Sequence, residues 1–162
     1  MSAAALPEWA LESLRAIGLM SPDPDDELHV ALVNTVLRLG AGAAQGVVLT
    51  AMRWDINWAQ KDAGVAFAKA KVDYEHLVAS VSTRAIAEGS ARGERVSVAF
   101  AEKLAEVEAY EHKLRYLLAE KREQSLRKML DTIETQVEVW RTGRADERAA
   151  DQAHARGFSG GA

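Results

Sequence analysis

The position of the prolines limits most strongly how this chain of 162 residues can fold. All three of them, Pro7, Pro22 and Pro24, occur in the first 24 residues. Beyond that point no proline interrupts a helix. The remaining sequence is rich in alanine, leucine and charged residues, and aromatic residues make up only 6% of the chain. Because this is the composition of long helices, the sequence predicts an all-α fold.

A short amphipathic helix is expected at the N-terminus, with a linker, over residues 1–22. Apolar residues from Leu6 to Leu19 recur at spacings of three and four, and Gly18 is placed to end the helix. Asp23 is expected to cap the next helix, with Pro24 at its first position.

Two long helices are expected to follow and to pair as an antiparallel, coiled-coil-like hairpin over residues 23–156. The first is expected to continue through the glycine-rich stretch Gly40–Gly46, although each glycine costs roughly 1 kcal/mol relative to alanine. A turn is expected at residues 89–93, where Gly89 can adopt the left-handed C-cap conformation. The second helix then runs from about Glu94 into the 150s, and residues 157–162 form a flexible tail.

The hairpin makes a packing prediction for Trp140. An antiparallel turn near residue 91 would place Trp140 opposite Ala41, Gly42 and Ala43. A large indole would then fill the space that small residues leave, as core packing requires.

Apolar surface exceeds what one hairpin can bury, which predicts a homo-oligomer or a protein partner. On the second helix one apolar stripe advances by threes and fours and is expected to pack against another helix; it consists of Leu104, Val107, Leu114, Leu118, Leu126, Leu130, Ile133, Val137 and Trp140. The residues expected at a partner or oligomer interface are Trp9, Leu14, Ile17, Trp54 and Trp58.

Charge is uneven along the second helix, although the net charge of the chain is −4. Its later part carries a basic strip formed by Lys121, Arg122, Arg127, Lys128, Arg141, Arg144 and Arg148. This strip is the candidate nucleic-acid-binding site, with contacts to phosphates and no base specificity. The alternative is a solvated face, because acidic residues interleave with the basic ones at helical ion-pair spacing.

Few motifs carry chemistry. The tripeptide Tyr-Glu-His occurs at residues 74–76 and 110–112, and Asp73 with His76, like Glu108 with His112, shares one helix face. A di-iron bundle would need a carboxylate at position 109, which is alanine. Exposed polar residues are therefore the preferred interpretation. No catalytic residue, cofactor or metal is expected, and an enzymatic role is not predicted.

The expected location is the cytoplasm of a bacterial cell. The absence of cysteine excludes disulfides and fits a reducing compartment. The sequence lacks a signal-peptide pattern and any apolar run of about 20 residues, so no membrane association is expected.

Four stretches of the second half carry a resemblance: Glu108–Glu120, Arg127–Glu134, Trp140–Arg141 and Arg148–Asp151. Over about residues 65–155 the chain resembles small helical-hairpin proteins of actinobacterial phages and prophages. The genes of such proteins often lie near genes for recombination and single-strand binding, so the resemblance implies a role connected with these functions. It implies no active-site residue.

The expected function is therefore that of a non-enzymatic helical hairpin that oligomerises and binds a protein or nucleic-acid partner in phage DNA metabolism. The alternatives are a virion scaffold or adaptor component and an inhibitor of a host enzyme.

Overall fold

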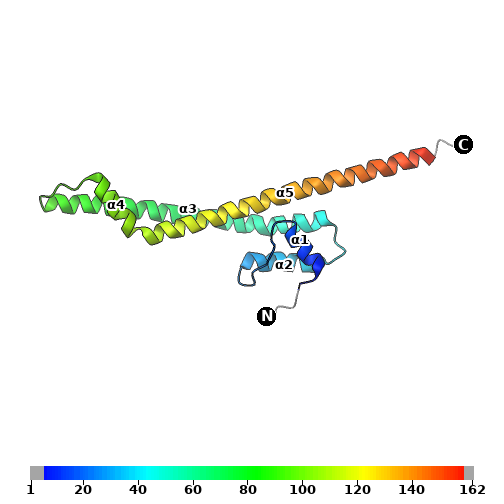
Figure 1. Cartoon of the computed structure of the whole chain (residues 1–162), viewed down its shortest axis with the longest axis horizontal. Helices are drawn as coiled ribbons and strands as arrows, with labels where there is room; N and C mark the ends of the chain where they lie inside the picture. Colours follow the sequence, from blue (N-terminus) through cyan, green and yellow to red (C-terminus); the bar gives the residue numbers. More distant parts are fainter. Residues whose placement is uncertain (1–5, 159–162) are drawn as a thin grey trace. The chain divides into compact units, whose positions relative to one another are not determined.

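The computed structural model describes residues 6–158, with side chains described as far as His154. Every regular element in this part of the chain is a helix: α1 (Glu8–Arg15), α2 (Glu27–Leu39), α3 (Gln45–Ala91), α4 (Val98–Glu108) and α5 (Tyr110–Phe158) (Figure 1). The all-α prediction is confirmed. Five helices take the place of the short helix and two long helices that were predicted.

The chain divides into two compact units. Unit 1 is formed by Met1–Ala59 and Leu126–Ala162, and unit 2 by Gln60–Ser125. Helices α3 and α5 contribute a segment to each unit and pack together in both. In unit 1, Arg53 of α3 forms an ion pair with Glu134 of α5. In unit 2, Gln60 Nε2 donates a hydrogen bond to Glu123 Oε1 at 3.1 Å.

Unit 1 has an apolar core of large side chains. The large side chains exposed by less than 2% in this unit are Leu14, Ile17, Leu32, Val36, Leu49, Met52, Ile56 and Ile133. They come from α1, the segment after it, α2, α3 and α5. Leu126 and Val137 of α5 are also buried. The later half of the predicted apolar stripe therefore packs inside its own unit.

Helix α2 begins later than predicted, and its cap is Asp26 in place of Asp23. The Asp26 carboxylate accepts hydrogen bonds from the backbone N–H groups of Leu28 and His29, at 2.9 and 3.2 Å. The Asp23 carboxylate instead accepts from the backbone N–H of Asp25 at 2.9 Å. Pro24 lies in the turn that precedes the helix. The acidic, proline-containing run thus forms a turn that ends at the cap.

Replacing Asp26 with alanine is expected to lower the free energy of unfolding by about 1 kcal/mol, because two amide groups of the first turn of α2 lose their acceptor. Urea denaturation followed by circular dichroism measures this loss. Asp25→Ala is the matched control, since the Asp25 side chain is exposed and the cap bonds belong to Asp26. Equal losses in the two variants would contradict the capping role.

The glycine-rich stretch breaks the helix, so the prediction that the helix continues through it is wrong. Helix α2 ends at Leu39, and Gly40 has a positive φ of 80°. The chain reverses here, since Thr35 Oγ1 donates to Asp55 Oδ2 at 2.6 Å. In one unbroken helix these two residues would lie about 30 Å apart. Packing of α2 beside α3 therefore outweighs the continuation of a helix that glycine already weakens.

Trp140 packs on a glycine, although not at the predicted position. A Cβ atom added to Gly46 would lie 2.6–2.7 Å from three ring carbons of Trp140, whereas one added to Gly42 would meet nothing within 4 Å. Helix α3 starts only at Gln45, so Gly46 is the glycine that this helix presents. The pairing of a large indole with a small residue is confirmed at the end of the stretch 40–46, and its position opposite residues 41–43 is corrected.

Helix α3 ends in a glycine cap at Gly93, and not at Gly89 as predicted. Gly93 has a φ of 75°, its N–H donates to Ser90 O, and the N–H of Glu94 donates to Gly89 O. These are the two bonds of a Schellman motif. Gly89 lies inside the helix, where an added Cβ would clash with Val96. Gly18, with a φ of 85°, ends α1 as predicted.

The second helical segment starts at Val98 and is interrupted at Ala109, so the predicted single helix from Glu94 is wrong in both respects. Ala109 has φ −87° and ψ 10°. Its N–H still donates to Ala105 O, and its carbonyl accepts from the Lys113 N–H. Helix α5 extends to Phe158, which corrects the start of the predicted tail; residues 159–162 lie outside the described part.

Candidate functional site

Unit 2 buries small residues and exposes large ones. Its buried apolar residues are Ala63, Val81, Ala101, Ala105 and Ala109. Its large apolar residues with 36–76% of their surface exposed are Val65, Val72, Ile86, Val98, Phe100, Leu104, Val107, Tyr110, Leu114, Leu117 and Leu118. Because stabilisation by burial grows with the apolar area removed from water, an alanine interior contributes little. The large apolar side chains of unit 2, whose burial would stabilise it most, are therefore exposed to water.

Helix α5 has two distinct faces in this unit. Tyr116 stacks on Phe67 and Tyr74 of α3, with ring centroids 5.7 and 5.9 Å apart. This side of α5 therefore faces α3. Leu114 and Leu118 lie two residues before and after Tyr116, which places them about 200° around the helix. Both side chains consequently project from the side opposite α3.

The outer apolar face, as we call it, consists of Phe100, Val107, Leu114 and Leu118. Phe100 and Val107, seven residues apart, share one side of α4, and Leu114 and Leu118, four residues apart, share one side of α5. Their exposed fractions are 62, 76, 40 and 63%, and Leu104 beside them is 43% exposed. Backbone hydrogen bonds flank the interruption at Ala109 but none of those described crosses it, so Phe100 and Val107 belong to α4, and Leu114 and Leu118 to α5. The first half of the stripe that was expected to pack against another helix, Leu104, Val107, Leu114 and Leu118, is 40–76% exposed within this chain.

Two exposed residues of opposite charge lie on or beside this face. Glu111 is three residues before Leu114, so it shares the side of α5 on which Leu114 lies. Arg115 follows Leu114 directly. Neither forms a hydrogen bond or an ion pair with the described residues of the chain. Both are thus available to groups outside this molecule.

Glu108 differs from Glu111 because it is engaged with α3. Arg84 Nη2 donates to both Glu108 carboxylate oxygens, at 2.7 and 2.8 Å. The hydrogen bond from Arg84 and the negative charge of Glu108 raise the pKa of Arg84 above its usual value. Both side chains are about half exposed, so this pair fixes the position of α4 on α3 more than it adds stability.

Unit 1 displays two exposed tryptophans, Trp54 and Trp58, with 64% and 58% of their surface in solvent. Trp54 borders a shallow groove of about 430 Å³, whose other lining residues are Gly46, Val47, Thr50, Ala51 and Trp140. Exposed indoles are typical anchors of protein interfaces. The two tryptophans predicted for an interface therefore lie where a partner can reach them.

Two other predicted interface residues belong to the core of unit 1. Leu14 is fully buried and Ile17 is 1% exposed, so neither can contact a partner in the folded unit. Helix α1 uses its apolar side to pack on its own chain, including α2. Trp9, the third predicted residue of this segment, remains half-buried.

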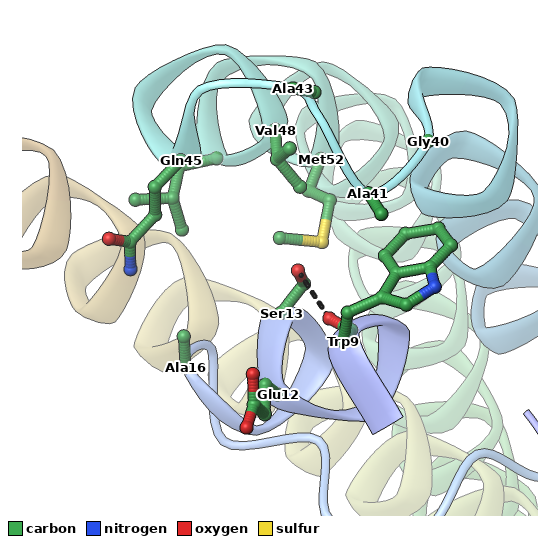
Figure 2. Close-up of a pocket in the computed structure, with 11 residues that line it drawn as sticks. Trp9, Glu12, Ser13, Ala16, Gly40, Ala41, Ala43, Gln45, Val48 and Met52 are labelled. Carbon is green, nitrogen blue, oxygen red and sulfur yellow. Dashed lines mark hydrogen bonds between the residues drawn. The ribbon is translucent and has the colours of Figure 1, made fainter. Parts of the chain in front are cut away.

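Trp9 borders a cavity of about 290 Å³ between α1 and the start of α3 (Figure 2). The Met52 thioether points into this space, and the Ser13 hydroxyl donates to the Trp9 carbonyl at 3.0 Å. Glu12 is the only titratable residue in the lining. The cavity therefore brings no two titratable side chains together.

The basic strip is exposed along its length and interleaved with acids. Lys121 Nζ donates to Gln124 Oε1 at 3.3 Å, and Arg144 pairs with Glu147 at 2.9 Å. Arg141, Arg144 and Arg148 share one face, but the same part of α5 exposes four acids, Glu138, Asp146, Glu147 and Asp151. The remaining members, Arg122, Arg127 and Lys128, are also exposed. Because acidic residues offset the basic ones, the strip is not the cationic surface that phosphate binding favours.

Of the two Tyr-Glu-His tripeptides, the first contributes a packing contact, whereas Tyr110 of the second is 61% exposed. Tyr74 stacks on Tyr116, while His76 is exposed and His112 half-buried. Within the described residues, no group of three or more histidine, aspartate or glutamate side chains is arranged to hold a metal ion.

Among the described residues, no helix has the length and apolar character needed to span a membrane. Neither family models, nor curated proteins, nor solved structures yield a match to this chain.

Proposed function

We propose that this chain is a non-enzymatic helical protein that self-associates through the outer apolar face and, in the associated form, binds a protein partner. In this proposal α3, α4 and α5 act as an antiparallel helical hairpin that displays the face. The observation that carries it is the composition of unit 2, whose buried apolar residues are four alanines and Val81, while eleven large apolar residues are 36–76% exposed. Burial of each large side chain contributes about 1.5–3 kcal/mol, which association would supply.

The partner is inferred to be a protein because of the exposed tryptophans of unit 1. Trp54 and Trp58 offer large apolar contacts of the kind that dominate protein interfaces. A nucleic-acid partner has less support, since the arginines of α5 are balanced by acids. An assembly or adaptor component needs no more than these two surfaces, one for a second copy and one for a partner.

The mass of the protein in solution tests this proposal. Light scattering over a concentration series is expected to give at least twice the chain mass of 17.6 kDa. The variant Val107→Glu/Leu118→Glu is expected to be monomeric, because association would bury four uncompensated carboxylates per pair of chains.

Val139→Glu is the matched control for this variant. Val139 lies on the same helix as Leu118, is also 63% exposed, and belongs to unit 1. Its substitution is expected to leave the mass unchanged, and circular dichroism checks that all variants remain helical. A monomeric parent protein, or a double variant that keeps its oligomeric mass, would contradict the proposal.

A further inference from the structure

We infer that the cavity between α1 and the start of α3 is a binding site for a small organic amine, with the apolar body of the ligand inside and its ammonium group at the rim. The inference does not depend on the proposed self-association, because every residue that lines the cavity belongs to unit 1. Three features of the cavity lead to it: its size, its apolar floor and the charge of its rim.

The cavity has room for a small molecule. Its volume is about 290 Å³, whereas an apolar cavity of about 150 Å³ is enough to bind benzene. One aromatic ring therefore fits together with a short chain. The lining combines buried residues with exposed ones, Glu12, Ala41 and Gln45, so a ligand can enter from solvent.

The floor of the cavity is apolar and comes from α3. Val48, Leu49 and Met52 line it, and each of them is exposed by 6% or less. The Met52 thioether points into the open space (Figure 2). Because thioethers and aliphatic side chains make favourable contacts with aromatic rings, this end of the cavity suits an apolar body that contains a ring.

Helix α1 supplies the opposite wall through one of its sides, which carries Trp9, Glu12, Ser13 and, directly after the helix, Ala16. The Trp9 indole extends from this wall toward Ala41, and its ring nitrogen lies on the side away from Met52 (Figure 2). The indole therefore offers the cavity its aromatic carbons, and not its N–H donor.

The polar groups that α1 brings to the cavity accept hydrogen bonds. The Ser13 hydroxyl already donates its proton to the Trp9 carbonyl at 3.0 Å, so its oxygen can only accept from a ligand. The exposed Glu12 carboxylate forms no hydrogen bond or ion pair with the described part of the chain. An ammonium group, which donates three hydrogen bonds and accepts none, complements both residues.

Charge selects against anionic ligands. Glu12 is the only charged residue in the lining, so a carboxylate or phosphate would place a second negative charge beside it without a positive partner. A cation instead gains from Glu12 and from the Trp9 ring, whose π-system attracts positive charge. The two residues are three positions apart and are therefore neighbours on the helix surface. The ligand class that fits is an organic cation with an apolar body.

Three probes of similar size and different charge test this inference by calorimetric titration of the full chain: phenethylamine, phenethyl alcohol and hydrocinnamate. The amine is expected to bind about tenfold more tightly than the alcohol, because only the amine gains from Glu12 and from the indole. The anionic hydrocinnamate is expected not to bind.

Two variants locate the bound amine. Glu12→Gln is expected to weaken its binding about fivefold and to leave that of the alcohol unchanged. Ala16→Leu, which puts a larger side chain into the cavity, is expected to abolish the binding of both, and circular dichroism checks that it remains helical. Asp25→Asn is the matched control, since Asp25 is an exposed acid of the same unit outside the lining, and it is expected to keep the parent affinity.

The remaining outcomes each refute the inference. An amine that does not bind at millimolar concentration would show that the cavity is no site for it. Equal affinity for amine and alcohol would refute the assigned charge of the ligand. An amine affinity that neither Glu12→Gln nor Ala16→Leu changes would place the binding elsewhere on the chain. Because Glu12 is exposed, its substitution tests the site even if the leucine disturbs the packing of α1.

Discussion

Replacing Leu14 with alanine is expected to lower the free energy of unfolding by about 2–5 kcal/mol, because the leucine is completely buried and its loss leaves a cavity. The oligomeric mass is expected to stay that of the parent protein. Urea denaturation followed by circular dichroism measures the first quantity, and light scattering the second. Together they distinguish a core residue from the interface residue that the sequence predicted.

Met20→Ala is the matched control for Leu14→Ala. Met20 lies six residues further along the chain and is 70% exposed, so its truncation creates no cavity. The expected change in unfolding free energy is within about 0.5 kcal/mol. A Leu14→Ala protein that keeps its stability but loses mass would show that α1 contacts another chain through this side.

Replacing Gly46 with alanine is expected to destabilise unit 1 by about 1–3 kcal/mol, as extra atoms in a packed site do. The new methyl group would lie 2.6–2.7 Å from the Trp140 ring, so the indole or the start of α3 has to move. The ordinary effect of this substitution has the opposite sign, since alanine is favoured over glycine in a helix by about 1 kcal/mol. The sign of the measured change therefore reports on the contact with Trp140.

Gly143→Ala provides the control in the same unit. Gly143 also lies in a helix, but an added Cβ there would meet nothing within 4 Å. This variant is expected to be more stable than the parent by up to about 1 kcal/mol. Combining Gly46→Ala with Trp140→Leu should recover part of the loss, since the smaller side chain leaves room for the methyl group. Equal stabilisation by both glycine substitutions would mean that Trp140 does not pack on Gly46.

Local chemistry was enough to predict the helical class and several boundaries. The absence of proline after Pro24 and the abundance of strong helix formers act within each helix, so no tertiary information is needed to read them. Gly18 ends α1 as predicted. The pairing of Trp140 with a glycine followed from the complementarity of large and small residues, which survives an error of a few residues in register.

Tertiary contacts decided the boundaries that were predicted incorrectly. Glycine in the stretch 40–46 weakens a helix without ending it, and the packing of α2 beside α3, which includes the hydrogen bond between Thr35 and Asp55, favours a reversal. That bond joins residues of two helices, so no local pattern announces it. The interruption at Ala109 has no glycine or proline to mark it, and nothing in the structure explains it.

The sequence predicted only part of the candidate site, for a related reason. Apolar periodicity identifies which side of a helix is apolar, but it does not say what covers that side. Leu14 and Ile17 were assigned to an interface and lie in the core, whereas Leu104 and Val107 were assigned to the hairpin and lie outside. The available signal was the row of alanines at 101, 105 and 109, which marks a second, narrower packing side of the same helix.

The division of the chain into two units also separates its chromophores. All four tryptophans, at positions 9, 54, 58 and 140, belong to unit 1, and all three tyrosines, at positions 74, 110 and 116, belong to unit 2. Indole fluorescence therefore originates in one unit, and phenol absorbance in the other. Each half of the molecule carries its own optical signal, so the loosening of unit 2 can be observed apart from the integrity of unit 1 without any added label.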